Sequence, residues 1–525
     1  MNTPTTTRSS SVHTLDAVLA EHAAERPEQA ALICEDRRTS YARLHLESDR
    51  GAHALSASGL SKGSRVGYLG RESEYYWELL YSCAKSGVVL VPINWRLTAP
   101  EVDYILRDSG AELLFIERDF LGIAQKLQSE LPDLKQLVLL DQADPAGITV
   151  TDWKANAPEE PWAGQSAEDD PVVQLYTSGT TGFPKGVVLA HRSFFAVRDA
   201  LAGAGLDWID FKSSDVSMIG MPGFHVGGVW WATQGFNAGL TNVVVRNFTP
   251  KDAVGLIRDL GITIACVVPA MLLMLLNEPG VSAADFATLR KVIYGGSPIS
   301  ESLLRRGMDV MGCEFAQIYG LTETGNTAIC LPPAAHRQGD ALLRAAGRPY
   351  PGFAVKVVDD KGEVLPTGEI GEICLRTPGH MVEYWRLPDA TAKTLVDGWI
   401  HTGDAGYLDA DGYVFVCDRI KDMIIRAGEN VYPAEIENAL AAHPAVSDVA
   451  VIGVPDEQWG EAAKAFVALR PDHTATAREF RRFLQDRLAE FKIPTMYEFV
   501  DTIPRNPSGK ILRRTLRDHN ANYAN

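Results

Sequence analysis

The sequence lacks the features of a membrane-bound, secreted or disulfide-bonded protein. Its seven cysteines are scattered without a CxxC pair, which favours buried thiols in a reducing compartment over a disulfide framework or a zinc site. Its most apolar stretch, residues 262–276, is too short to cross a bilayer and contains Pro269. Residues 1–12 have no apolar run typical of a signal peptide. These absences predict a cytoplasmic protein without a transmembrane segment.

Basic residues are outnumbered by acidic ones. The chain has 50 Lys and Arg against 67 Asp and Glu, which gives a formal net charge of −17. Such a balance argues against general binding to nucleic acid or to anionic membranes. Any site for a polyphosphate must therefore be made positive by the residues around it.

Strand-like and helix-like segments alternate through the first half of the chain. The predicted strands are 30–34, 65–69, 88–93 and 262–268, and the predicted helices are 15–24, 40–56 and 74–86. This alternation predicts an α/β domain with a largely parallel sheet. Residues 141–170 are polar, acidic and proline-bearing, which predicts a connecting surface loop.

The pattern changes after Asp418. Strands are predicted over 446–454 and 462–469, and helices over 436–442 and 476–488. This stretch is a separate α+β unit of about a hundred residues, a normal size for a domain. A length of 525 residues with 46% hydrophobic content likewise predicts more than one globular domain.

The most informative stretch is YTSGTTGFPKGV, residues 176–187, which lies between two apolar runs. Its glycines can adopt positive φ and its hydroxyls can donate hydrogen bonds to an anion. The residues that could surround a phosphate in this way are Thr177, Ser178, Gly179, Thr180, Thr181 and Gly182. Lys185 adds a mobile positive charge. The loop is not a Walker A motif, because Pro184 stands where the second glycine belongs. The alternative is a plain polar hairpin.

This stretch resembles the phosphate loop of the adenylate-forming superfamily, which includes acyl-CoA synthetases, luciferases and peptide-synthetase adenylation domains. Matching stretches recur as far as Lys510. The resemblance implies an α/β fold with a large, multi-subdomain N-terminal domain, whose mostly parallel sheets are flanked by helices. It also implies a small, mobile α+β C-terminal domain. We place the AMP-binding domain at 1–420 and the small domain at 421–525, with Lys421 as the hinge.

The resemblance also implies the nucleotide site. In the family, the stretches that match 294–298 and 317–320 enclose the adenine. The expected contacts to ATP and AMP beyond the phosphate loop are Gly295, Gly296, Ser297, Gln317, Ile318, Tyr319, Gly320, Thr322, Asp404, Arg419 and Lys510. Asp404 would accept hydrogen bonds from the ribose hydroxyls. Glu323 would bind Mg²⁺, which prefers oxygen ligands, with Thr177 as a further metal contact.

A loop with one histidine is predicted to border the acyl pocket. A lone His among apolar residues is otherwise more often a core residue, but the family places an aromatic–His pair here. The predicted pocket residues are Phe224, His225, Val226, Val229, Trp230, Gly296 and Gly320. Amino-acid-activating relatives carry Asp where this chain has His225, which argues against an amino-acid substrate. The family match makes His225 a catalytic candidate beside Lys185 and Lys510.

The C-terminal part contains two further candidates. Gly428 and Glu429 lie in a glycine turn that the family uses beside the pantetheine channel, on the CoA side. Lys510 follows a turn pinned by proline and glycine, and the family match makes it catalytic. The alternative is a basic solvated face, because Arg513, Arg514 and Arg517 follow at near-helical spacing.

Together these motifs predict an ATP-dependent acyl-CoA synthetase of fatty-acid metabolism, with ATP, Mg²⁺ and coenzyme A as cofactors or co-substrates. The acid would form an acyl adenylate and then a thioester. An apolar acid is expected, because the pocket stretches contain no charged residue.

The alternatives are an aryl or steroid-side-chain acid, a non-catalytic homologue, and a carrier-protein-loading adenylation module. The chain ends fifteen residues after Lys510, which argues against a fused carrier domain. The oligomeric state stays open, a homodimer included.

Overall fold

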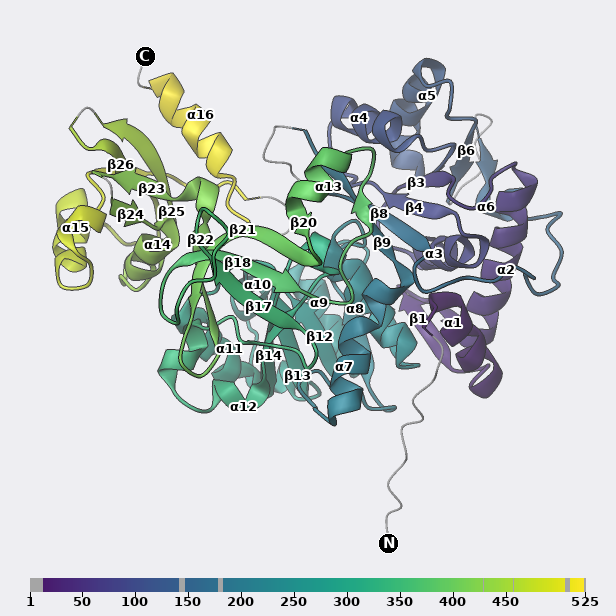
Figure 1. Ribbon diagram of the computed structural model, residues 1–525. Coiled ribbons are helices and arrows are strands. Elements are labelled where there is room, and N and C mark those ends of the chain that lie inside the picture. The colour runs from purple at the N-terminus through teal and green to yellow at the C-terminus, as the bar shows by residue number, and fades with distance from the viewer. Residues whose placement is uncertain are drawn as a thin grey trace, which may run out of the picture.

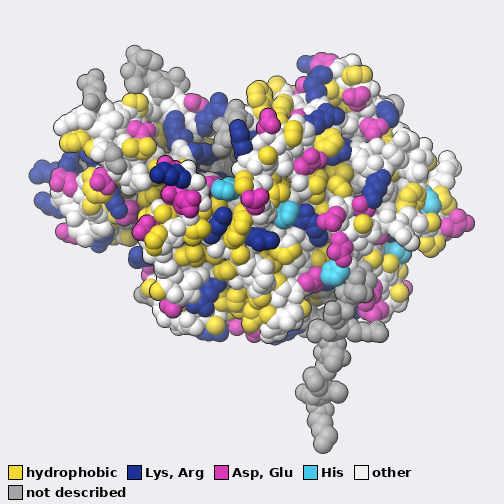
Figure 2. Space-filling model, in the orientation of Figure 1, with side chains coloured by type: hydrophobic (Ala, Val, Ile, Leu, Met, Phe, Trp, Pro, Cys, Tyr) yellow, Lys and Arg dark blue, Asp and Glu magenta, His cyan; other side chains and the backbone are white. Residues whose placement is uncertain are grey.

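A computed structural model describes residues 13–140, 147–177, 183–427, 429–456, 458–505 and 510–523. A small C-terminal lobe, which includes helix α16 (Arg513–Tyr523), lies beside a much larger N-terminal part (Figure 1). Figure 2 shows a notch between this lobe and the rest of the surface, with Lys and Arg side chains gathered beside it. The strands form four sheets.

The first large sheet has nine strands and is mostly parallel. In spatial order its strands are β16 (Arg348–Pro349), β15 (Ile329–Leu331), β14 (Glu314–Tyr319), β13 (Lys291–Gly295), β12 (Ile264–Val267), β10 (Val216–Ile219), β11 (Thr241–Val244), β1 (Ala30–Cys34) and β2 (Arg37–Ser40). The run from β14 to β1 is parallel, and β2, β15 and β16 are antiparallel to their neighbours. The carboxyl ends of β13 and β14 therefore meet at one edge of the sheet, where α/β folds bind ligands.

The second large sheet has eight strands. In spatial order they are β19 (Glu383–Tyr384), β9 (Lys185–Ala190), β8 (Pro171–Thr177), β4 (Val89–Pro92), β3 (Arg65–Leu69), β5 (Leu113–Ile116), β6 (Gln136–Leu139) and β7 (Ile148–Thr149). The run from β8 to β7 is parallel, whereas β9 and β19 are antiparallel. The phosphate-loop stretch thus connects two adjacent strands of this sheet.

The remaining two sheets are smaller and mostly antiparallel. One contains β17 (Ala354–Val358), β18 (Gly371–Arg376), β21 (Trp399–Leu408), β20 (Leu395–Val396) and β22 (Val414–Arg419). The other, in the C-terminal lobe, contains β24 (Glu429–Val431), β23 (Ile424–Arg426), β26 (Gly460–Leu469), β25 (Val446–Asp456) and β27 (Met496–Phe499). The fold is α/β, with mixed, mostly parallel sheets in the large part and a small α+β C-terminal domain.

Helices pack around these sheets. Those of the large part are α1 (Leu15–Glu25), α2 (Tyr41–Ala57), α3 (Glu74–Ser86), α4 (Ala99–Ser109), α5 (Leu121–Glu130), α6 (Val150–Trp153), α7 (Ala196–Ala204), α8 (Val226–Asn237), α9 (Pro250–Asp259), α10 (Pro269–Leu276), α11 (Glu301–Met311), α12 (Pro333–His336) and α13 (Pro388–Thr394). The lobe adds α14 (Pro433–Ala441), α15 (Ala477–Gln485) and α16. None of the described helices is long and apolar enough to cross a membrane.

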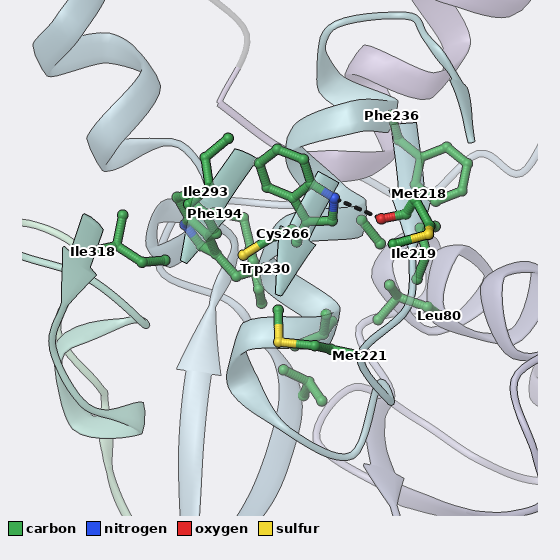
Figure 3. Packing of buried hydrophobic residues seen from close by; sticks show 14 of the residues in the cluster. Leu80, Phe194, Met218, Ile219, Met221, Trp230, Phe236, Cys266, Ile293 and Ile318 are labelled. Carbon is green, nitrogen blue, oxygen red and sulfur yellow. Dashed lines mark hydrogen bonds between the residues drawn. The ribbon is translucent and has the colours of Figure 1, made fainter. Parts of the chain in front are cut away.

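One hydrophobic core joins the two large sheets. Leu80 of α3, Met218 of β10, Trp230 of α8 and Ile293 of β13 belong to the same buried cluster (Figure 3). The C-terminal lobe buries separate clusters, which include Ile424, Val451 and Phe480 in one of them. Separate cores are typical of separate domains. The division into 1–420 and 421–525 stays a prediction.

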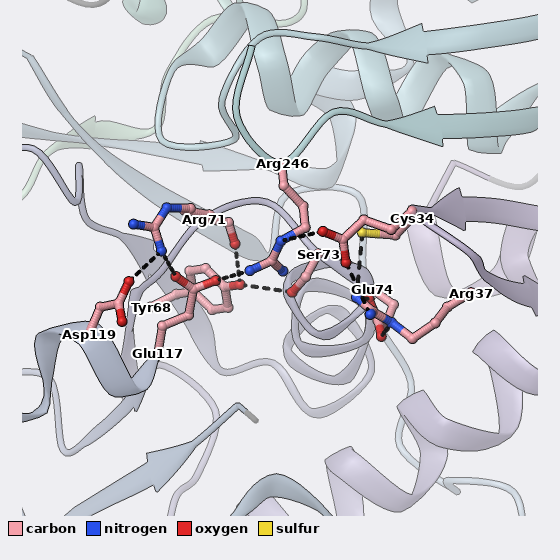
Figure 4. Close-up of polar contacts among 10 residues, drawn as sticks. Cys34, Arg37, Tyr68, Arg71, Ser73, Glu74, Glu117, Asp119 and Arg246 are labelled. Atoms are coloured by element: carbon pink, nitrogen blue, oxygen red, sulfur yellow. Dashed lines mark hydrogen bonds and ion pairs between the residues drawn. The ribbon is translucent and has the colours of Figure 1, made fainter. Parts of the chain in front are cut away.

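A cluster of ion pairs also ties the two large sheets together (Figure 4). Arg246, which follows β11, pairs with Glu117, which follows β5, at 2.6 Å. Arg71 contacts the same carboxylate at 2.8 Å. A surface cleft of about 840 Å³, lined in part by Arg71 and Arg246, opens beside this cluster. Its lining includes none of the residues predicted to bind ATP or the acid.

The helices and strands that the sequence predicted are present in the structure. β1, β3 and α3 have the predicted bounds, and the other predicted helices and strands are present with ends shifted by a few residues. Helix α2 begins after Ser40 because the Ser40 side chain accepts a hydrogen bond from the Arg43 N–H at 3.2 Å.

The prediction of a connecting surface loop for 141–170 is confirmed over 155–170, which contain no helix or strand and are mostly exposed, and it is wrong over 147–154. Residues 147–170 contain β7 and α6, and Lys154 is buried after that helix. Its ammonium binds Glu47 at 2.5 Å and Glu78 at 2.9 Å. Composition cannot distinguish a polar surface loop from a segment that buries its charges in pairs. Residues 141–146 lie outside the described residues.

Candidate active site

The ends of the phosphate-loop stretch are held close together. β8 and β9 pair in antiparallel register, with Thr177 opposite Lys185. Helix α4 holds the residues just before β9 in place. The Tyr104 hydroxyl donates to the Pro184 carbonyl at 3.0 Å, and the Tyr104 ring stacks on Phe183. The predicted phosphate contacts Ser178, Gly179, Thr180, Thr181 and Gly182 lie outside the described residues.

Tyr384 links Lys185 to Glu323. The Lys185 ammonium lies 4.8 Å from the centre of the Tyr384 ring. The Tyr384 hydroxyl donates to Glu323 Oε1 at 2.6 Å. Tyr384 reaches this position because β19 pairs with β9, which sets it opposite Val187. The phosphate-loop lysine and the predicted metal ligand, far apart in the sequence, therefore share one neighbour.

The predicted adenine-binding residues gather at the carboxyl ends of β13 and β14. These residues are Gly295, Gly296, Ser297, Gln317, Ile318, Tyr319 and Gly320. Gly295 must be glycine, because an added Cβ would lie 2.3 Å from the Ile318 carbonyl oxygen. Gly296 has φ +83°, which favours glycine as well. Gly295 is therefore required by the close packing of β13 on β14, whereas Gly296 leaves the backbone after β13 without a side chain. Thr322 follows at the start of a short 3₁₀ turn that also contains Glu323.

Asp404 is buried and has two strong partners. Its Oδ2 accepts the Tyr319 hydroxyl at 2.7 Å, and its Oδ1 contacts Arg419 Nε at 2.8 Å. Asp404 and Arg419 are directly paired across β21 and β22. Burial raises the pKa of Asp404, and Arg419 and Tyr319 oppose that rise. The predicted ribose ligands therefore lie side by side, next to the end of the adenine stretch.

Lys510 enters the same region from the C-terminal lobe. Its side chain reaches solvent. The protein atoms around its ammonium group nevertheless displace water, and this desolvation lowers the pKa of Lys510 below the usual 10.5. The nearby positive charge of Arg419 lowers it further. The carboxylates of Asp404 and Glu323 act in the opposite direction, and Lys421 in the same direction as Arg419. Lys510 thus lies within electrostatic reach of the predicted ribose ligand Asp404 and of the predicted metal ligand Glu323. In this structure Lys510 of the C-terminal lobe is therefore directed toward residues of the large N-terminal part.

The predicted hinge stretch is bound to the C-terminal lobe. Lys421 lies in a short 3₁₀ turn, Ile420–Asp422, directly after β22. Asp422 accepts an ion pair from Arg517 at 2.8 Å, and Arg513 binds Glu437 at 2.8 Å. Two of the three arginines of the predicted basic face are therefore paired rather than merely solvated. Glu429 is exposed on β24, opposite Arg426, and Gly428 lies outside the described residues.

His225 is neutral and has an unused nitrogen. It occupies the N-cap position of α8 without a side-chain capping hydrogen bond, and its Nε2 is buried without a partner among the described residues. Burial lowers its pKa to about 4, and the positive charges of Lys510 and Arg96 add to this effect. A neutral imidazole with a free nitrogen, within electrostatic reach of Lys510, could contact an acid or its adenylate.

Four of the other predicted pocket residues, Phe224, Val226, Val229 and Trp230, are close to His225 along the chain. Phe224 contacts the His225 ring, and Val226 and Val229 continue into α8. Trp231 belongs to the core, because its indole N–H donates to the Met218 carbonyl at 2.9 Å. Trp230 is 1% exposed, and its indole nitrogen has no partner among the described residues. Trp230 is therefore the better candidate for a pocket wall.

Sequence reasoning missed three residues that position this site. Tyr384 holds Glu323, Glu372 Oε1 accepts the Gly403 N–H at 2.9 Å, and Glu72 Oε1 accepts the Gly223 N–H at 2.8 Å. Each contact joins segments that are separate in the sequence. No local spacing marks such residues, so only the fold identifies them.

Two family descriptions match the chain. Residues 19–385 match the AMP-binding enzyme family, and residues 435–510 match the AMP-binding enzyme C-terminal domain.

Two curated relatives and one solved structure are similar over nearly the whole chain. Fatty acid–[acyl-carrier-protein] ligase ScoC of Streptomyces coeruleorubidus is 60% identical, over 97% of this chain and 96% of the relative. Long-chain-fatty-acid–CoA ligase FadD13 of Mycobacterium tuberculosis is 36% identical, over 92% of this chain and 93% of the relative. The anthranilate CoA ligase AuaEII, solved with anthranoyl-AMP, has a TM-score of 0.89 at 28% identity, covering 96% of this chain and 97% of that one. The chain therefore belongs to the AMP-binding enzyme family of adenylate-forming acid ligases.

Proposed function

We propose that this protein activates a fatty acid, or a similarly apolar acid, with ATP and transfers the acyl group to the thiol of a carrier protein. The acid's carboxylate would attack the α-phosphate of ATP, so that a C–O–P linkage forms, pyrophosphate leaves and an acyl adenylate results. The carrier thiolate would then attack the acyl carbon, with AMP as the leaving group. The reaction is that of an AMP-forming acid–thiol ligase.

The observation that carries the choice of acceptor is the 60% identity to a fatty acid–[acyl-carrier-protein] ligase, which extends over 97% of this chain. Coenzyme A, the acceptor expected from the motifs, is the second candidate. It is favoured by the 36% identity to a long-chain-fatty-acid–CoA ligase. The higher identity supports the carrier protein. The proposed carrier is a separate protein, which a ligase of this kind can meet in solution.

The geometry supports the adenylation step. Phosphoryl chemistry of this kind needs positioning and charge neutralisation rather than a covalent enzyme intermediate. Lys185 and Lys510 would bind the phosphates, Asp404 and Arg419 the ribose, and the backbone at Gly295 and Gly296 the adenine. Thr177, Tyr319 and Thr322 are proposed as further contacts to the nucleotide.

Mg²⁺ fits the residues present. Glu323 offers a carboxylate whose orientation is set by the Tyr384 hydroxyl on Oε1, and Thr177 ends β8 nearby in the fold. One carboxylate with phosphate oxygens and water is a usual Mg²⁺ environment. Bound there with ATP, the ion would neutralise phosphate charge.

The acid is proposed to lie against His225 and Trp230. His225 is uncharged and Trp230 is buried in apolar surroundings. An apolar chain would therefore be stabilised there by burial. An aryl acid remains the alternative substrate, and a panel of acids distinguishes the two.

The test compares two acceptors. With a saturating fatty acid and ATP, kcat/KM for thioester formation is measured with a phosphopantetheine-bearing acyl carrier protein and with coenzyme A. Carrier loading more than about tenfold more efficient than CoA acylation supports the proposal. Efficient CoA acylation without carrier loading would replace it with a CoA ligase. An ATP–pyrophosphate exchange assay over acids from acetate to dodecanoate and benzoate then identifies the substrate class.

A further inference from the structure

Three side chains with metal-binding atoms converge on one face of the antiparallel sheet. Glu372 and Cys374 come from β18, and His401 comes from β21. The His401 Nδ1–H donates to Glu372 Oε2 at 2.8 Å, and Cys374 Sγ lies 3.5 Å from the same nitrogen. The ligand atoms all lie within 4.8 Å of one another.

The register of the two strands explains this convergence. Cys374 and His401 are directly opposite, so their side chains project from the same face. A bulge follows, because β21 places extra residues between His401 and Ala405. Gly403 allows the bulge with φ +68°, and its N–H turns toward Glu372 Oε1 at 2.9 Å. Glu372 is thereby held with its second oxygen directed at His401.

We propose that Glu372, Cys374 and His401 form a binding site for a single Zn²⁺ ion. Thiolate, imidazole and carboxylate are the ligands that Zn²⁺ takes, at about 2.3, 2.0 and 2.1 Å. A tetrahedral ion with these bond lengths spaces its sulfur and nitrogen ligands ~3.6 Å apart, close to the 3.5 Å between Cys374 Sγ and His401 Nδ1. Water would complete the coordination.

The environment is suited to holding a divalent ion. The Glu372 and His401 side chains are 24% and 26% exposed, so an ion can reach the site from solvent, whereas Cys374 is fully buried. A carboxylate and a thiolate would together neutralise the charge of Zn²⁺. Glu372 Oε1 can keep its bond to Gly403 while Oε2 binds the ion.

Binding requires one proton to leave the protein. Cys374 must lose its thiol proton to solvent, and the His401 proton must move from Nδ1 to Nε2. Burial raises the pKa of Cys374 to about 12; Glu372 adds to the rise and Lys356 opposes it. Lys356 is the residue that faces Cys374 from β17. Because the thiolate and not the thiol is the metal ligand, Zn²⁺ affinity should increase with pH.

The proposed Zn²⁺ site lies next to Asp404 and is distinct from the proposed Mg²⁺ site. Gly403 immediately precedes Asp404, and Glu372 would hold the bulge through one oxygen and the ion through the other. The Mg²⁺ ligands proposed above, Glu323 and Thr177, are on other elements. A zinc ion here would therefore cross-link β18 to the segment that carries the ribose ligand.

The test uses the untagged full chain without nucleotide or Mg²⁺. Zn²⁺ is titrated in competition with a chelator at about pH 8, and Co²⁺ replaces it as an absorbing probe. The parent and Cys313→Ser, which removes a partly exposed thiol elsewhere, should bind one ion per chain and show thiolate-to-Co²⁺ charge-transfer absorption. Cys374→Ala and His401→Gln should each weaken Zn²⁺ binding by at least ~10-fold. Substitution of residues that only hydrogen-bond to metal ligands already lowers metal affinity by about that factor.

Several outcomes would overturn the proposal. These are unchanged affinity in both variants, a Co²⁺ complex of the parent without thiolate absorption, and an absence of stoichiometric binding by the parent. Should Cys374→Ala fail to fold, the partly exposed His401→Gln and the spectrum of the parent still decide the question.

Discussion

Glu72 gives the protein a buried acid whose ionisation should cost stability at neutral pH. Its side chain is 4% exposed, between β3 and α3. Glu72 Oε1 accepts the Gly223 N–H, while Oε2 is buried with no partner among the described residues. Burial raises the pKa of Glu72 to about 7, although the hydrogen bond from Gly223 acts in the opposite direction. The negative charge of Glu117 adds to the rise, and Arg246 counteracts it.

The sign and size of the effect follow from these values. In the unfolded chain Glu72 loses its proton near 4.5, and in the folded chain near 7. Between these values the folded state binds more protons, so the free energy of unfolding falls as pH rises through this window. At full ionisation the difference amounts to about 3 kcal/mol. Glu72→Gln keeps an oxygen for Gly223 but cannot ionise, and it should therefore remove this loss.

Urea unfolding of the parent and the variant at several pH values between about 5 and 8 measures the effect. The two proteins should have similar midpoints near pH 5, and the variant should become the more stable one as pH rises. Exposed Glu369→Gln is the control and should follow the parent throughout. If the difference between Glu72→Gln and the parent does not grow with pH, Glu72 ionises freely in the folded state and the reasoning is wrong.

Three further predictions concern the reaction. Lys185→Ala should reduce the use of ATP by about 10²-fold with little change in melting temperature, since Lys185 stands at the very start of β9 and its side chain is only partly buried; unfolding of the variant would contradict this. Lys510→Ala should slow acyl-adenylate formation by ~10²–10³ but leave transfer from a supplied acyl adenylate within a few-fold, and equal loss in both half-reactions would disprove its assignment to adenylation. Efficiency should rise about fourfold per methylene until the pocket is full, and Trp230→Ala should move that limit to longer acids; a flat response with strong activity on benzoate would favour an aryl acid.

Local patterns were sufficient to predict local structure. Apolar runs bounded by polar residues gave β1 and β3, and a helical period with a serine cap gave α2. Positions such as Gly295 and Gly296 could also be selected, because a bare backbone next to a strand end is visible in the sequence. These features depend on neighbours within a few residues of each other.

Contacts between distant segments could not be predicted in this way. Tyr384 reaches Glu323 only because β19 adds to the edge of β9, and a two-residue strand leaves no periodic signal. Cys374 and His401 face one another because of the register of β18 and β21. The absence of a CxxC pair argued against zinc, yet metal-binding atoms can converge from different strands without any spacing in the sequence.

Sequence motifs could not identify the thiol that accepts the acyl group. Lys185, Glu323, Asp404 and Lys510 are proposed to serve the first half-reaction, in which ATP and the acid are the only reactants. The same residues are needed whether the thiol that follows belongs to coenzyme A or to a carrier protein. Their presence therefore supports adenylation and cannot select between the two acceptors. That choice depends on surfaces that meet the acceptor. For this reason, overall similarity to a carrier-protein ligase carries more weight for the second step than any motif of the first.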